Sequence, residues 1–365
     1  MELKQLQRTM ANEEGEIMND LALHIKEKAL SLGYAGCGII KVDDVAEYAV
    51  KLKERMTHVR WGWLQFGQFR KFAKPQKENA WAKSIIITLN DNTVYNIPET
   101  LKGVYAKDYL IDSRLNEQSE GWARRLAFGK YLQDLEIQNL NEPKFGVTAL
   151  RWAASKAGLG IVRANNFFYT ENGSAITIDA WLIDKELELI DSVELKKCPE
   201  HCGKCITACP TKALSNPFTT SLFDCVSFIT TLSVEKGLGM PSTKQQKAIG
   251  CRVYGCDVCQ DVCPFNKDKW RGGRDFPGLN ELAAKLPPEK IMAMNYSEMA
   301  RELAPQFWYI GVRNLWKWKI NAIIAMSNGY SDIYEEPIKL GLIDIDRRVR
   351  RFAKKICKKH AIKIS

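Results

Sequence analysis

The sequence predicts a three-part chain: an α/β (α+β) domain over residues 1–188, a ferredoxin-like cysteine module over 189–275 and a helical extension over 276–365. Three observations predict this division. Helix and strand patterns alternate in the first part, nine of the eleven cysteines lie between residues 198 and 263, and helical patterns dominate after Arg271-Gly272-Gly273. At 365 residues the chain also exceeds the usual size of a single hydrophobic core.

The first predicted elements are an amphipathic helix and two strands. Residues 16–33 have helical spacing of apolar side chains, and Gly33 is typical of a helix C-cap. Residues 33–42 (GYAGCGIIKV) and 84–89 (SIIITL) are predicted to be buried strands. Between them, residues 59–72 (VRWGWLQFGQFRKF) concentrate aromatics and glycines. The aromatic side chains of this segment could belong to the core or form a platform for a flat ligand.

Further helices and strands complete the first domain. Residues 120–135 are predicted to form a helix with Trp122, Leu126, Tyr131 and Leu135 on one side. Residues 148–160 form another predicted helix, ended by a glycine pair. Strands follow within 161–170 and 175–184, with Asn172-Gly173 as the turn. This alternation favours a domain built around a central sheet.

The C-terminal region is predicted to be helical. Residues 312–329 and 344–357 have the spacing of an antiparallel helix pair. The pair suggests a single HEAT-like repeat, although one copy has the same period as a simple helical hairpin.

Positive charge is concentrated at the C-terminus. The net charge is +10, and residues 347–365 hold nine Lys or Arg and no acid. Val349, Phe352, Ile356 and His360 recur at helical spacing, which predicts a narrow apolar stripe and a broad cationic surface. Binding of a nucleic-acid phosphate backbone and a plain basic tail are both open interpretations.

Nothing in the sequence predicts a membrane span. No run of 18 apolar residues exists, and the polar N-terminal segment has neither an apolar region nor paired arginines. The expectation from this pattern is cytoplasmic residence, which also suits unpaired thiols.

Two interleaved cysteine runs predict a pair of [4Fe–4S] clusters. Each run ends in Cys-Pro, as in two-cluster ferredoxins, where the last cysteine of a run ligates the other cluster. We therefore assign the ligands of one cluster as Cys198, Cys202, Cys205 and Cys263. The ligands of the other cluster are assigned as Cys209, Cys225, Cys256 and Cys259.

Other readings of the cysteines are weaker. Structural zinc sites usually have two separated C-x2-C pairs without a trailing Cys-Pro, and disulfides need an oxidising compartment. The C-x3-C spacing from Cys198 to Cys202 is irregular, and Cys251 is close enough to compete for a ligand position. Cys37 and Cys357 are expected to be ordinary buried or partly buried thiols.

Together these residues resemble the cobalamin-dependent epoxyqueuosine reductases, which are relatives of the reductive dehalogenases. The similarity is densest over residues 156–184 and over the cysteine runs, and it touches roughly 300 residues. The resemblance implies a base-off cobalamin in the first domain, reduced by the two clusters, and a C-terminal extension that binds tRNA in some members. The residues that match the family's corrin-contact motifs are Arg163, Asn165, Gly173 and Ser174.

One family feature is absent from its expected position. The family carries a proton-donating aspartate shortly before the helix that ends in A-G-L-G, and counting back from Gly160 places Lys144 there. Opening an oxygen-containing ring needs a proton for the departing oxygen, so another acid must supply it. The candidates are Lys144, Tyr105 and Tyr169, with Tyr109 and Asp108 as further alternatives.

These inferences lead to two hypotheses of function. The first is a cobalamin-dependent oxidoreductase that acts on a tRNA base or carries out a related small-molecule reductive deoxygenation or dehalogenation. It takes electrons from an external low-potential donor of the ferredoxin or flavodoxin type. The second is an iron–sulfur electron carrier or reductive activator for a partner corrinoid protein, docking through its basic end. The 188-residue first domain favours the enzyme, because a carrier needs no such domain.

Overall fold

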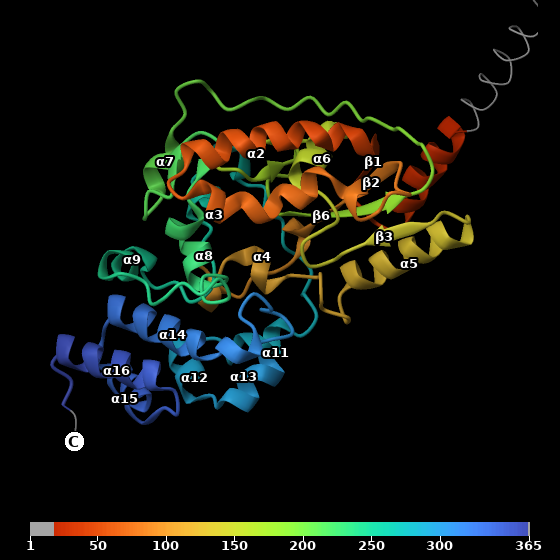
Figure 1. The fold of residues 1–365 in the computed structure, drawn as a ribbon. Coiled ribbons are helices and arrows are strands. Elements are labelled where there is room, and N and C mark those ends of the chain that lie inside the picture. Colours follow the sequence, from red (N-terminus) through yellow and green to blue (C-terminus); the bar gives the residue numbers. More distant parts are fainter. Residues whose placement is uncertain (1–17, 364–365) are drawn as a thin grey trace, which may run out of the picture. The chain divides into compact units, whose positions relative to one another are not determined.

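The computed structural model describes residues 18–363 (Figure 1). The chain forms two compact units. Unit 1 contains residues 18–93 and 117–202, and unit 2 contains residues 94–116 together with the chain from 203 onward. Residues 94–116 therefore belong with the cysteine module and the C-terminal helices. Residues 18–31 are helical as predicted, whereas the first two residues of the predicted helix lie outside the described residues.

An antiparallel sheet forms the centre of unit 1 (Figure 1). Its strand order is β1 (Gly36–Lys41), β2 (Ser84–Asp91), β6 (Ile176–Ile183) and β3 (Asn139–Asn141). Gly38 lies opposite Ile87, and Ile86 lies opposite Trp181. Three of the predicted strand segments, 33–42, 84–89 and 175–184, therefore form this sheet, whereas β3 was not predicted.

Helices cover both faces of this sheet, which explains why β2 is a continuous apolar run. On one face, Ile85 and Ile87 pack with Ala153 and Ala154 of α6 (Leu150–Lys156). On the other face, Ile86 and Trp181 pack with the helix at 18–31 and with α5 (Glu120–Asp134). Alternate residues of one strand therefore enter two separate cores.

The buried face of α5 differs from the predicted one. Leu126 is 60% exposed, whereas Arg125, Phe128 and Leu132 are buried. Arg125 lies inward because its Nη2 is 3.0 Å from Oδ1 of the buried Asp179 on β6. An unpaired carboxylate is costly to bury, and Arg125 therefore occupies the interface between α5 and the sheet, where it pairs with Asp179.

A hairpin follows α6. Gly158 adopts φ +71°, and a Cβ there would lie 1.7 Å from the Asp191 carbonyl oxygen, so the end of α6 requires glycine. The segment 161–170 contains two short strands, β4 (Ile161–Val162) and β5 (Phe168–Tyr169), joined by a tight turn. A second turn at residues 170–173 leads into β6, as the Asn172-Gly173 pair predicts.

Unit 2 begins with short elements around the cysteines. They are α4 (Lys107–Leu110), α7 (Lys204–Ala208), β7 (Leu214–Asn216), β8 (Thr219–Thr220), α8 (Val226–Thr230), α9 (Thr243–Ile249) and α10 (Val258–Asp261). The helices that follow are α11 (Leu279–Ala283), α12 (Pro288–Ala293), α13 (Tyr296–Glu302), α14 (Trp316–Asn328), α15 (Glu335–Leu340) and α16 (Arg347–Lys359). Aromatic rings pack between the elements around the cysteines and the C-terminal helices. The ring centre of Tyr254 lies 4.9 Å from that of Trp318 and 5.0 Å from that of Phe307.

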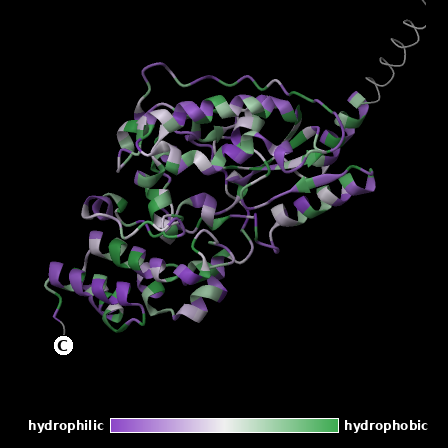
Figure 2. Cartoon of the chain, in the orientation of Figure 1, coloured by the Kyte–Doolittle hydropathy of each residue, from purple (hydrophilic) through white to green (hydrophobic). Residues whose placement is uncertain are grey.

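Helices α14 and α16 are the predicted C-terminal pair, with α15 between them. Residues 316–327 of α14 are all buried, as in a helix that is covered on every side. Three of the four residues of the predicted stripe on α16, Val349, Phe352 and Ile356, are buried, together with Ala353 and Cys357. The fourth, His360, is half-buried and follows the helix, and the exposed residues of α16 are lysine and arginine (Figure 2). In the part of the chain that the structure describes, no helix combines the length and the apolar character needed to cross a bilayer.

Candidate functional site

The four cysteines assigned to the second cluster lie in unit 2 and affect one another. Burial raises the pKa of the Cys259 thiol, and the neighbouring thiols of Cys225, Cys256 and Cys209 raise it further. Burial also raises the pKa of Cys256 to about 11. Four thiols that lie close enough to shift one another's pKa fit a [4Fe–4S] cluster, because four cysteine thiolates hold such a cluster.

Short helices position these thiols. Cys209 follows α7, Cys225 precedes α8, Cys256 precedes α10 and Cys259 lies within it. Main-chain N–H groups of Phe228 and Ser227 lower the pKa of Cys225 against the larger effect of burial. Amide hydrogen bonds to cluster sulfurs are one way in which proteins set a reduction potential.

The ligands assigned to the other cluster are Cys198, Cys202, Cys205 and Cys263. Cys205 is buried, and the other three are half-buried. No disulfide joins cysteines of the described residues. Within residues 18–363, no three acidic, histidine or cysteine side chains converge closely enough for a single metal ion.

The remaining cysteines differ in exposure. Cys37 and Cys357 are fully buried, as expected, and burial raises the pKa of Cys37 to about 12. Cys251 is exposed, and its Sγ would lie 3.1 Å from a Cβ placed on Gly329 at the end of α14.

Two of the predicted corrin contacts, Asn165 and Arg163, meet the candidate proton donor Tyr169 in unit 1. Asn165 Nδ2 donates to the Tyr169 hydroxyl at 2.8 Å, and the Arg163 guanidinium lies 5.0 Å from the centre of the Tyr169 ring. All three side chains are buried. Gly173, at φ +91°, and the buried Ser174 follow at the next turn of the same hairpin. These amide, hydroxyl and guanidinium groups have the hydrogen-bonding chemistry that the amide side chains of a corrin require.

Two arginines that the sequence analysis missed meet at this hairpin. Arg55 Nη2 donates to Asn166 Oδ1 at 2.8 Å, and Arg151 donates to the Asn166 carbonyl oxygen. Burial lowers the pKa of both guanidiniums, and the Arg55 charge lowers that of Arg151 further. Among residues 18–363, neither arginine pairs with a carboxylate. Two like charges held together in this way favour an anionic ligand. The only sequence signal was the Asn165-Asn166 pair, which is typical of a turn.

The candidate proton donors lie in different environments. Lys144 is exposed on a loop whose main-chain N–H groups donate to the Glu142 carboxylate. Tyr105 is a core residue, because its buried hydroxyl donates to the Leu286 carbonyl at 2.6 Å. The Tyr109 hydroxyl lies 2.9 Å from Ser227 Oγ. Asp108 stands out, since burial and the nearby Asp257 raise its pKa to about 7.

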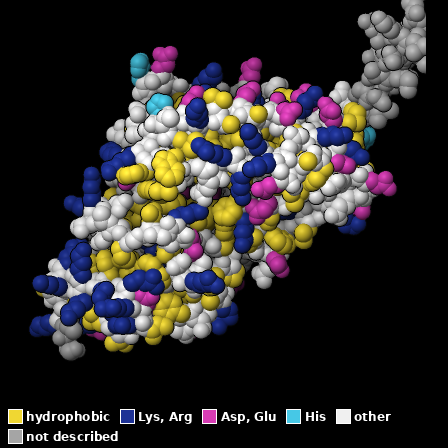
Figure 3. Space-filling view, viewed as in Figure 1, with side chains coloured by type: hydrophobic (Ala, Val, Ile, Leu, Met, Phe, Trp, Pro, Cys, Tyr) yellow, Lys and Arg dark blue, Asp and Glu magenta, His cyan; other side chains and the backbone are white. Residues whose placement is uncertain are grey.

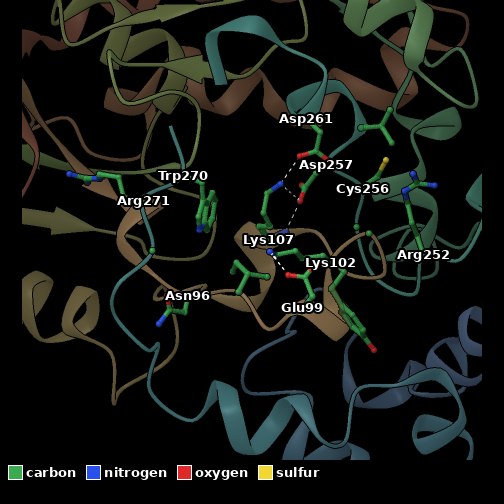
Figure 4. Close-up of a pocket in the computed structure, with 16 residues that line it drawn as sticks. Asn96, Glu99, Lys102, Lys107, Arg252, Cys256, Asp257, Asp261, Trp270 and Arg271 are labelled. Atoms are coloured by element: carbon green, nitrogen blue, oxygen red, sulfur yellow. Dashed lines mark hydrogen bonds and ion pairs between the residues drawn. The ribbon is translucent and has the colours of Figure 1, made fainter. Parts of the chain in front are cut away.

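A cavity of about 750 Å³ opens beside the second quartet (Figure 4). Lys107 lies in it, with its Nζ 2.5 Å from Asp261 Oδ1 and 3.7 Å from Asp257 Oδ2. Trp270 and Cys256 also line it, whereas Cys209, Cys225 and Cys259 do not. Cys256 is therefore the one member of the assigned quartet that lines this cavity.

The fold and the cysteine pattern define a double-cluster iron–sulfur protein. Residues 197–266 match the family of the 4Fe-4S double cluster binding domain. The chain is 30% identical over 337 residues to the epoxyqueuosine reductase of Salmonella typhimurium, covering 85% of this chain and 81% of that protein. The chain belongs to the epoxyqueuosine reductase family and is an iron–sulfur oxidoreductase.

Solved structures of the family share the fold. A selenomethionine-labelled epoxyqueuosine reductase superposes with a TM-score of 0.73 at 22% identity, covering 93% of this chain and 90% of that one. An epoxyqueuosine reductase with a modified tRNA-Tyr stem loop superposes with a TM-score of 0.65 at 21% identity, covering 93% and 98%.

Proposed function

We propose that this protein is a cobalamin-dependent reductase that removes the epoxide oxygen from a modified base of tRNA. The observation that carries the proposal is the combination of the double-cluster module with the buried polar hairpin of unit 1 in a chain of this family. The relative with a tRNA-Tyr stem loop supports RNA as the substrate class. Converting an epoxide to an alkene and water consumes two electrons and two protons, so the protein must deliver both.

Electron delivery is assigned to the two clusters. Their ligand sets are those predicted from the sequence: Cys198, Cys202, Cys205 and Cys263, and Cys209, Cys225, Cys256 and Cys259. The cavity beside Cys256 is the proposed point of entry, because a donor of the ferredoxin or flavodoxin type that reaches it approaches a cluster ligand directly.

Cobalamin is assigned to unit 1. When bound, it would supply a strongly reducing cobalt centre for the bond-breaking step. Arg163, Asn165, Gly173 and Ser174 would hold its amide periphery, and Tyr169 would fix the orientation of Asn165. The protein's own contribution is to bind and orient the ring and to exclude water.

Proton delivery is assigned to a group other than the family's aspartate. Asp108 of unit 2 is one candidate, since a carboxyl with a pKa of about 7 carries a proton near neutral pH. Lys144 and Tyr169 remain candidates in unit 1. Tyr105 is the weakest of the predicted set because its hydroxyl already donates within the core.

RNA binding is assigned in part to α16, which we also infer to belong to a HEAT-like extension. Its apolar stripe is buried, and Lys354, Lys355 and Lys358 are exposed. Lysine and arginine side chains gather on the surface over α16 in Figure 3. Replacing these three lysines by glutamine should reduce the slope of log affinity against log salt for a tRNA stem loop by up to about three. A slope unchanged from that of the wild type would remove α16 from the interface.

The corrin assignment is tested by binding. Anaerobically purified protein with added cobalamin should shift the corrinoid absorption spectrum, and Asn165→Ala should weaken this binding with iron content unchanged. The alternative function, an electron carrier for a partner corrinoid protein, predicts a free-cobalamin spectrum and no turnover without a partner. Turnover of a modified stem loop by the isolated chain would exclude the carrier.

A further inference from the structure

An exposed aromatic surface lies at the junction of α2 (Glu47–His58) and α3 (Gly62–Phe66). We call it the tryptophan platform: Trp61, Trp63 and Leu64, which are 58%, 67% and 55% exposed. Hydrophobic side chains gather at the surface over α3 in Figure 3, beside lysine and arginine side chains. The sequence left this segment open between core and platform, and the structure shows that both indoles lie outside. Clustered exposed apolar side chains of this size mark an interaction site.

The backbone is held so that it displays these side chains. Trp61 adopts the left-handed region at φ +58°, where a bulky residue is an outlier. The next position requires glycine, because a Cβ on Gly62 would lie 2.3 Å from the Met56 carbonyl oxygen. Backbone strain of this kind persists only where the surrounding structure imposes it, and it is concentrated at functional sites.

A ladder of phenylalanine rings continues from α3. The ring centres of Phe66 and Phe69 are 6.3 Å apart, and those of Phe69 and Phe72 are 6.1 Å apart. Cations lie over these aromatics: Arg60 is 5.9 Å from the Trp61 ring centre and Lys71 is 5.1 Å from that of Phe72. Phe66 is buried and Phe69 and Phe72 are half-buried, so the exposed rings beside these cations are those of Trp61 and Trp63.

The charge of this segment is strongly one-sided. Residues 50–77 hold eight Lys or Arg and a single acid, Glu54, which pairs with Lys51 at 3.3 Å. Arg60, Arg70, Lys71 and Lys74 are exposed. Exposed rings interleaved with cations are typical of proteins that bind single-stranded nucleic acid, where bases stack on the rings and phosphates lie on the cations. Charge complementarity thus favours an RNA partner.

We propose that unpaired nucleotides of an RNA stack on Trp61 and Trp63, with their phosphates near Arg60 and Lys71. The proposal rests on the proposed function, because that RNA is the loop of the tRNA substrate. Whereas α16 contributes charge alone, the platform would distinguish unpaired loop nucleotides from a duplex stem.

The test compares two RNAs and two variants. The double variant Trp61→Asn/Trp63→Ala removes both rings, and asparagine tolerates the left-handed backbone at residue 61. The matched control is Phe218→Asn, since Phe218 is also an exposed aromatic, 49% exposed and at φ +59°. Fluorescence anisotropy measures binding of a tRNA anticodon stem loop and of a blunt RNA duplex of equal charge at one salt concentration. Circular dichroism and iron content confirm that the variants fold.

The double variant should bind the stem loop about tenfold or more weakly, with duplex affinity and the control unchanged. Unchanged affinity for the stem loop would overturn this proposal and leave the proposed function standing. An equal loss for stem loop and duplex would also overturn it, because stacking on unpaired bases predicts a difference. Loss of binding to anionic phospholipid vesicles with RNA affinity intact would assign the platform to a membrane surface. A wild-type protein that binds no stem loop would refute the RNA substrate itself.

Discussion

Unit 1 is held by a continuous sheet, whereas the cysteine-bearing part of unit 2 has little regular structure. Strands β2 and β6 pair over eight residues and bury both faces. Between residues 203 and 266, the longest regular element is the seven-residue α9. These short elements share a core with the C-terminal helices, because Val226, Ile249 and Tyr254 pack with Trp318, and bound clusters are expected to add to their stability. The comparison teaches that one unit depends on packing and the other depends in part on its clusters.

The largest effect is expected from a substitution that removes one cluster from unit 2. Cys259→Ser should remove one cluster, so that iron content falls by about half and turnover is lost. Hydrogen exchange should accelerate in residues 203–266 and stay slow in β2 and β6. The exposed neighbour Cys251 provides the control, since Cys251→Ser should retain full iron. A Cys259→Ser protein with all its iron would show that the ligand assignment is wrong.

The second effect tests the packing of unit 1. Arg125→Ala leaves the Asp179 carboxylate buried without its cation, which typically costs about 3–5 kcal/mol of unfolding free energy. Denaturant unfolding of unit 1, followed by hydrogen exchange of β6, measures the loss. Lys130→Ala is the control, because its ion pair with Asp134 is exposed and such pairs contribute about 0.5 kcal/mol or less. Equal effects of the two variants would contradict the structural role of the buried pair.

The smallest effect concerns protonation in unit 2. Burial raises the pKa of Asp108 to about 7, so the folded protein holds this proton more tightly than the unfolded chain does. The stabilisation is full below the ordinary carboxyl pKa and is lost as pH rises to about 7. Asp108→Asn cannot ionise, so its unfolding free energy should fall less between pH 4 and pH 8 than that of the wild type.

The same variant bears on catalysis. If Asp108 donates the proton, wild-type turnover should fall about tenfold per pH unit above 7, and Asp108→Asn should lose both the activity and this dependence. Asp268→Asn, at an exposed position of the same unit, should keep the wild-type profile. A variant at Asp108 with wild-type turnover at every pH would return the role to Lys144 or Tyr169.

The parts of the fold that depend on residues close together in the sequence could be predicted from the sequence. The strands at 84–89 and 175–184, the turn at Asn172-Gly173 and the buried stripe of α16 follow from periodicity and turn chemistry. The face of α5 could not, because Leu126 and Arg125 exchange their expected positions only when Asp179 lies opposite. Residues 94–116 join unit 2 for a similar reason, since Tyr105 packs with Phe307 from the far end of the chain.

The sequence by itself determined the electron-transfer chemistry of this protein, because cluster ligation needs particular side chains at short, fixed spacings. Only the tertiary structure decided where Arg55 and Arg151 meet at Asn166, that a cavity opens beside Cys256, and that Trp61 and Trp63 face solvent. The physical reason is that side-chain direction and burial depend on what packs against each element, and those partners come from distant segments of the chain.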